Sequence, residues 1–135
     1  MDLEQIARYR AQSKRYLDWA VEEAHQRRWD RVEDMLWGSL GAAVKAVALS
    51  RGVTLEGSGA VVRYARRLAK ETRDRRLARV IQQVLEPASL RDPFETLGSL
   101  DCLYFIDEEV RTALERLWDW SDGSSGRRDR ELADG

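Results

Sequence analysis

Apolar side chains recur every three or four positions along most of this chain, the spacing that lines one face of an α-helix. Four such segments cover residues 2–28, 30–51, 58–72 and 74–86. A fifth covers residues 92–120, where the pattern leaves open whether the chain forms one helix or two. Alternation of the strand type reaches no useful length. The sequence therefore predicts an all-α protein, an up-down helical bundle of four to five helices.

Start and stop signals divide these segments. Asp30 is expected to cap the second helix, with Glu33 three residues later as its capping-box partner. Gly52 is expected to end that helix in the left-handed conformation. Asp74 opens a continuation of the third helix or a separate helix. Asp92–Pro93 pairs an N-cap residue with a proline at the first helical position.

The least polar long run, Trp29–Gly52, predicts a central helix with two apolar surfaces. One is a bulky arc formed by Val32, Met35, Leu36, Leu40, Ala43, Val44 and Val47. The other carries small side chains and one lysine: Gly38, Gly41, Ala42, Lys45 and Ala48. A glycine inside a helix costs about 1 kcal/mol against alanine. The small surface is therefore expected to face another helix, in the same chain or in a partner subunit.

Lys45 has two interpretations. Its ammonium group could reach a phosphate or carboxylate in a pocket. The structural interpretation, which we favour, places its stem along apolar neighbours with the charge in water. Trp29, Trp37, Trp118 and Trp120 are expected to anchor the core or an interface.

Length and composition set broad limits on the protein. At 135 residues the chain predicts one domain, residues 1–121, followed by a disordered tail over 122–135 that has too little apolar mass to fold. The formal net charge of −1 excludes a bulk polyelectrolyte role. An N-terminus without an apolar signal core, and apolar runs too short to span a membrane, predict a cytoplasmic protein. Arginine outnumbers lysine and asparagine is absent, which favours a GC-rich, thermophilic source.

The sharpest charge feature is a basic stripe at helical spacing opposite the apolar side of the third helix. It consists of Arg63, Arg66, Arg67, Lys70 and Arg73. Such a stripe can neutralise several phosphates and would give salt-dependent RNA or nucleotide binding. Tyr64 is the only aromatic residue nearby, so no base-stacking platform is evident.

A structural explanation of the stripe is favoured over the functional one. The segment 92–122 is strongly acidic, so a basic helix beside an acidic helix would form a surface network of ion pairs, within the fold or across a dimer. The sequence gives no support for a classical catalytic site or a metal site. His25 is the only histidine, and Cys102 is the only cysteine and is expected to be a small buried apolar residue. We therefore predict no metal and no cofactor.

The second helix resembles that of the HEPN superfamily, the "higher eukaryotes and prokaryotes nucleotide-binding" helical domain, and within it the archaeal paralogous-repeat (PaREP) type. The resemblance rests on Trp29, Trp37, Gly38, Ala42, Val44, Lys45, Ala46, Ala48, Arg51 and Gly52. The segment from Leu100 to Phe105 resembles that family's Leu-His-x-x-Phe-Tyr stretch. Together they imply a bundle over roughly residues 3–120 that often dimerises through its later helices.

The resemblance also implies ribonuclease activity in many members, through an arginine followed four to six residues later by a histidine. This sequence lacks that pair, and Asp101 stands where the family's histidine would align. An aspartate does not serve as a near-neutral general acid unless its pKa is strongly raised. We therefore predict that metal-independent ribonuclease activity is absent. A divergent nuclease using Asp101 with Arg91 or Arg111 is the weakest alternative.

The sequence favours a non-catalytic HEPN-like module that works through protein association, as a homodimer. The main alternative is an RNA- or nucleotide-binding module that uses the basic face of the third helix. A toxin–antitoxin component paired with a nucleotidyltransferase is a further role that the resemblance implies.

Overall fold

Every regular element is helical within residues 2–85 and 99–134, which the computed structural model describes. The elements, in chain order, are α1 (Leu3–His25), α2 (Trp29–Ser50), α3 (Gly57–Thr72), α4 (Arg75–Leu85), α6 (Ser99–Tyr104), the π-helical segment η2 (Phe105–Val110) and α7 (Arg111–Asp134). The prediction of an all-α bundle is confirmed for these residues.

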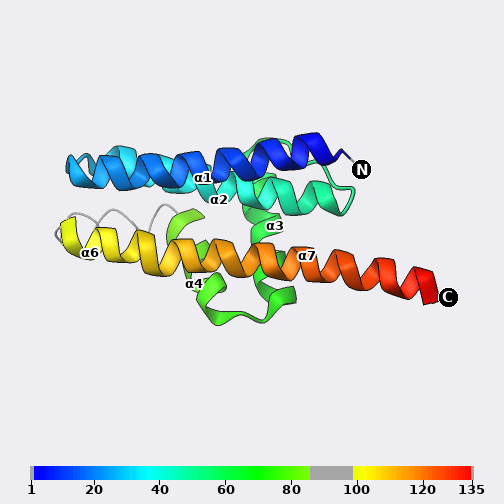
Figure 1. Cartoon of the computed structure of the whole chain (residues 1–135). Coiled ribbons are helices and arrows are strands. Elements are labelled where there is room, and N and C mark those ends of the chain that lie inside the picture. Colours follow the sequence, from blue (N-terminus) through cyan, green and yellow to red (C-terminus); the bar gives the residue numbers. More distant parts are fainter. Residues whose placement is uncertain (1, 86–98, 135) are drawn as a thin grey trace.

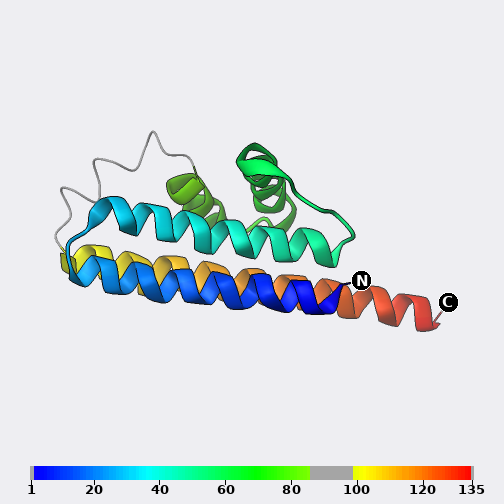
Figure 2. The same cartoon turned by 90° about the horizontal axis from the view of Figure 1, so that it is seen from above.

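Three long helical rods run side by side: α1, α2 and the continuous rod of α6, η2 and α7 (Figure 1). The chain reverses between α1 and α2, and α7 ends beyond the N-terminal end of α1 (Figure 2). The shorter helices α3 and α4 lie across the long rods. Both contact α2, and α4 also contacts α7. The bundle therefore combines an antiparallel layer with a crossing helix pair.

α2 lies at the centre of the core, as its composition predicts. Its bulky arc is buried except for the half-buried Met35. The largest side chains that are almost fully buried come from five elements: Leu36, Leu40, Leu68, Leu77, Leu85, Ile106 and Leu117. At roughly 1.5–3 kcal/mol for each fully buried aliphatic side chain, this shared core dominates the stability of the fold.

The predicted cap at Asp30 is wrong. α2 begins one residue earlier, at Trp29, and Arg28 stands at its N-cap without a side-chain cap bond. The cause is the tight α1–α2 connection. The Arg28 amide donates to Glu23 O (3.0 Å), while its carbonyl accepts from Val32 N (3.0 Å). Arg28 thus belongs to both helix ends, and Asp30 falls inside the first turn.

The predicted helix end at Gly52 is confirmed. Its φ is +78°, a left-handed conformation that glycine adopts without steric cost. The Gly52 amide donates to Leu49 O (3.0 Å), and the Val53 amide donates to Ala48 O (2.8 Å). This hydrogen-bond pair is the Schellman motif. It ends α2 and turns the chain toward α3, which begins at Gly57 with φ +82°.

Asp74 starts a separate helix, one of the two alternatives that the sequence left open. Its Oδ1 accepts hydrogen bonds from the amides of Arg76 (3.0 Å) and Leu77 (3.2 Å), which cap the N-terminus of α4. Arg73 precedes it with φ +55°, so α3 stops there.

The last described segment is one continuous rod from Ser99 to Asp134. The acidic triplet 107–109 lies within η2 and starts no new helix. The predicted restart at Asp92–Pro93 lies outside the described residues. The backbone stays helical over 122–134, where composition predicts a disordered tail. Residues 127–133 are rich in good helix formers, and extending an existing helix needs no new nucleus. The domain boundary at residue 121 stays a prediction.

Cys102 is fully buried in the core, as predicted, and burial raises the pKa of its thiol to about 11. The thiol is therefore protonated and shielded at neutral pH. In the described part of the chain, no helix has the length and apolarity that crossing a bilayer requires.

Candidate functional site

The predicted basic stripe lies on the solvent side of α3. The opposite side of this helix is buried through Val61, Tyr64, Ala65 and Leu68. All five cationic residues of the stripe are exposed, and we call them the basic face: Arg63, Arg66, Arg67, Lys70 and Arg73. Their placement follows from helical periodicity, because burying the apolar side leaves the charged side in water.

Most of the positive charge on this face is not neutralised by the fold. Arg67 pairs with Glu71 one turn later, at 3.2 Å. Within the described residues, Arg63, Lys70 and Arg73 form no ion pair. Arg75 and Arg79 of α4 are exposed as well. The face therefore presents concentrated positive charge although the whole chain has a net charge of −1.

The two acids within residues 63–79 are held by arginines from other helices. Arg51 Nη2, at the end of α2, donates to Glu71 Oε2 at 2.8 Å. This hydrogen bond lowers the pKa of Glu71 below its ordinary value of 4.5. Asp74 accepts two hydrogen bonds from Arg116 Nη1 of α7, at 3.0 and 3.1 Å. The local acids are thus largely engaged by partners outside the basic face.

The alternative explanation, a network of ion pairs between basic and acidic helices, is present in part. Arg76 Nε lies 3.8 Å from Glu109 Oε2, and Arg116 pairs with Asp74. These two pairs join α4 and its N-cap to η2 and α7. Neither pair uses a residue of the basic face, and among the described residues Arg63, Lys70 and Arg73 take no part in such a network.

Tyr64, the aromatic residue nearest the stripe, is turned into the protein. Only 9% of it is exposed, and its hydroxyl accepts a hydrogen bond from Arg51 Nη1 at 3.4 Å. It therefore offers no ring on which a base could stack. In the part of the chain that the structure describes, the basic face thus presents charge without an aromatic platform.

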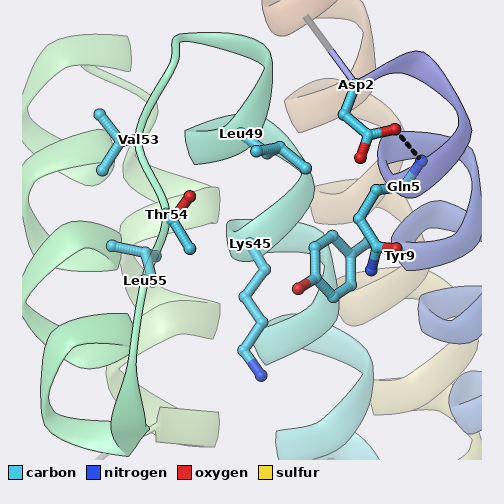
Figure 3. Close-up of a pocket in the computed structure, with 8 residues that line it drawn as sticks. All are labelled: Asp2, Gln5, Tyr9, Lys45, Leu49, Val53, Thr54 and Leu55. Atoms are coloured by element: carbon cyan, nitrogen blue, oxygen red, sulfur yellow. Dashed lines mark hydrogen bonds between the residues drawn. The ribbon is translucent and has the colours of Figure 1, made fainter.

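A second feature is a cleft of about 180 Å³ where the start of α1, the end of α2 and the 52–56 loop meet (Figure 3). Its lining comprises Asp2, Gln5, Tyr9, Lys45, Leu49, Val53, Thr54 and Leu55. Lys45 Nζ lies 6.0 Å from the centre of the Tyr9 ring, at the limit of a cation–π contact. The half-buried stem of Lys45 runs along the cleft, which agrees with the structural interpretation of this residue.

At Gly38, the small-residue surface of α2 faces α1 of the same chain. A Cβ atom added at Gly38 would lie 3.1 Å from the Tyr16 ring of α1. Beside it, the Ser39 hydroxyl donates to Ser13 O at 2.7 Å. This close α1–α2 approach explains the glycine at position 38. The surface that motivated the homodimer prediction is therefore occupied within the chain at this point.

The structure does not bring together Asp101 and Arg111, two residues of the weakest alternative, a divergent nuclease. Asp101 is exposed near the start of α6, and Arg111 Nη2 pairs with Asp107 Oδ1 at 3.2 Å. Ten residues of helix separate Asp101 from Arg111, roughly 15 Å along the axis. Arg91 lies outside the described residues. No group of three or more metal-ligating side chains gathers in the part of the chain that the structure describes.

Sequence reasoning missed the contacts of two arginines with α7. Arg10 stacks 4.4 Å from the Trp118 ring and lies 3.2 Å from Asp122 Oδ2. Arg51 stacks 5.0 Å from the Trp120 ring. The partners are more than sixty residues apart in sequence, so no local spacing signals them. The predicted role of Trp118 and Trp120 as packing anchors agrees with their place against the core.

Comparison with known proteins gives no relative: no family model matches the chain, and no curated protein or solved structure matches it significantly. The likeness to the HEPN superfamily therefore stays a prediction that rests on the residues of α2 and α6.

Proposed function

We propose that this chain is a non-catalytic RNA-binding helical module that holds the phosphate backbone on the basic face. One observation carries the proposal: Arg63, Lys70 and Arg73 are exposed and form no ion pair within the described residues, while nearby acids are engaged from other helices. The resemblance to HEPN domains favours RNA as the ligand.

The physical basis of binding is counterion release. Each phosphate neutralised by a lysine or arginine frees a condensed cation, so the logarithm of the binding constant falls linearly with the logarithm of the salt concentration. The three cations of the face that form no ion pair within the described residues, Arg63, Lys70 and Arg73, allow about three contacts. We expect dissociation constants in the range of non-specific binding, roughly 10⁻⁴ to 10⁻⁶ M at physiological salt.

The test is fluorescence anisotropy with labelled RNA across about 50–200 mM salt. The variant Arg63→Gln/Lys70→Gln/Arg73→Gln should bind more weakly, and its salt slope should be smaller by about three. Glutamine keeps the helix and removes only the charge. If affinity and slope stay unchanged in this variant, the proposal is wrong.

A matched control uses Lys14→Gln/Arg15→Gln/Arg27→Gln. These residues are exposed on α1 and its C-terminal turn, and they form no ion pair among the described residues. The control removes the same three charges and the same residue types. We expect it to keep most of the affinity, since a general charge effect would weaken both variants equally.

Self-association remains a second candidate because two large aromatic side chains are exposed on the surface. Trp19 of α1 is 46% exposed, and Tyr104 of α6 is 63% exposed. Aromatic residues are enriched at protein interfaces. Sedimentation equilibrium should detect a dimer that Trp19→Ala or Tyr104→Ala weakens. A monomer at all practical concentrations would exclude this candidate.

A further inference from the structure

We propose that the basic face recognises base-paired RNA rather than single strands, through the backbone and without reading bases. This inference rests on the proposed function and specifies its ligand. It follows from the absence of exposed rings among the described residues of the face, from the rigid helix that carries most of its cations and from the geometry of the RNA duplex.

Within the described residues, the basic face offers no exposed ring to an unstacked base. Tyr64 is buried, and the exposed aromatic residues Trp19 and Tyr104 lie on α1 and α6 rather than on α3 or α4. Proteins that hold single strands gain about 1–3 kcal/mol per base from aromatic stacking. Without that gain, ordering a flexible strand along α3 costs conformational entropy that only charge contacts offset.

The cations of the face are fixed to a rigid support. Val61 and Leu68, on the opposite side of α3, are fully buried in the common core. From Arg63 to Lys70 the helix rises about 10 Å, and these charges occur on successive turns. Arg73 follows at the left-handed C-cap of the helix. A duplex backbone is also rigid. When a rigid duplex docks onto the rigid helix α3, little beyond the contacting side chains loses conformational entropy. The entropy cost of binding is therefore smaller for the duplex than for a flexible single strand.

The chemistry of the face suits a backbone reader. Its side chains are arginine and lysine only, without the asparagine or glutamine amides that pair with adenine. The major groove of an RNA duplex is too deep and narrow for side chains to read, so duplex RNA is recognised by shape and by backbone contacts. The expected binding is independent of sequence.

The experiment compares an RNA duplex with an unstructured single strand of the same length, at equal phosphate concentration, by fluorescence anisotropy with the full chain. We expect the duplex to bind at least about tenfold more tightly. The Arg63→Gln/Lys70→Gln/Arg73→Gln variant should lose most of this preference, whereas the matched α1 variant keeps it.

The outcomes separate the two proposals. If the single strand binds as tightly as the duplex, this inference fails and the proposed function stands. If neither RNA binds, both fail. A second duplex of unrelated sequence should bind with the same affinity within about twofold. A difference of more than about tenfold between the two duplexes would overturn backbone-only recognition.

Discussion

At the scale of single residues, Arg51 connects three helices through one guanidinium group. It ends α2, donates to Glu71 and Tyr64 of α3, and stacks on Trp120 of α7. Its side chain is 23% exposed and that of Glu71 is 31% exposed, so water screens the pair only in part. Burial lowers the pKa of Arg51, but its hydrogen bonds to Tyr64 and Glu71 together raise it above the ordinary value. The hydrogen bond from Arg51 in turn lowers the pKa of Glu71.

The Arg51–Glu71 pair makes stability depend on acid. Because the pKa of Glu71 is lower in the folded state, its contribution is fully present above the ordinary value of 4.5 and is lost as the pH falls below it. Glu71→Gln should reduce the free energy of unfolding by about 1 kcal/mol at pH 7. Urea unfolding of both proteins should show this difference shrinking toward pH 3. A difference that stays constant or grows with acid would contradict the assignment.

Gly38 tests the close approach of α1 and α2. In an open helix, Gly→Ala stabilises by up to about 1 kcal/mol, but here the added methyl would lie 3.1 Å from the Tyr16 ring. Overpacking of this kind costs about 1–3 kcal/mol. Gly38→Ala should therefore be destabilising by about 1 kcal/mol in denaturant unfolding.

Gly59→Ala is the control for this substitution. The nearest atom to its added methyl is the flexible end of Arg63, Nη1 at 3.3 Å, which can move aside. We expect Gly59→Ala to be neutral or stabilising. Equal stabilisation by both substitutions would show that Tyr16 does not restrict the site at Gly38.

At the scale of elements, two helices end on a left-handed arginine: Arg27 after α1 and Arg73 after α3. The Arg27 amide donates to Ala24 O (3.1 Å) and the Arg28 amide to Glu23 O (3.0 Å), which is the same Schellman pattern that Gly52 completes after α2. The left-handed conformation costs an ordinary residue roughly 1–2 kcal/mol. The short connection between α1 and α2 imposes this cost at Arg27, because the chain reverses there within three residues.

Arg27→Gly should therefore stabilise the protein by about 0.5–1 kcal/mol, measured by thermal or denaturant unfolding. Arg15→Gly, at an exposed position inside α1, should destabilise it by about 1 kcal/mol, since glycine is a poor helix former. The same substitution, arginine to glycine, is thus expected to change stability in opposite directions at the two positions, because the backbone is left-handed at Arg27 and helical at Arg15. If Arg27→Gly destabilises as Arg15→Gly does, the left-handed turn is absent in solution.

At the scale of the whole molecule, charge is segregated. Glu71 and Asp74 pair with Arg51 and Arg116. In contrast, Arg63, Lys70 and Arg73 form no ion pair with any described residue. Arg63→Gln/Lys70→Gln/Arg73→Gln should therefore change the melting temperature by less than about 2 °C, measured by circular dichroism. A large loss of stability would mean that the basic face is structural. Unchanged stability with lost RNA binding would separate function from folding.

Helical periodicity, which depends only on local sequence, was enough to predict the buried side of α3 and the bulky arc of α2. The glycine at position 52 predicted the left-handed stop. Periodicity also predicted that the basic residues from Arg63 to Lys70 lie opposite the buried side of α3, whereas Arg73 follows at the left-handed C-cap. The helix start at Trp29 was not predictable from local sequence. The Schellman turn at the end of α1 places Arg28 at the N-cap position of α2, so Asp30 lies inside the helix and does not cap it. The cap depended on the neighbouring helix rather than on local preference.

The sequence by itself thus determined the helical class, the helix ends at Gly52, Thr72 and Asp74, and the existence of a basic stripe. Tertiary structure alone decided what the surfaces contact. It placed Tyr16 over Gly38, turned Tyr64 inward to Arg51, and assigned Glu71 and Asp74 to arginines from α2 and α7. Periodicity fixes which side of a helix is apolar or charged, but packing between distant segments decides which charges are neutralised and which remain free to bind.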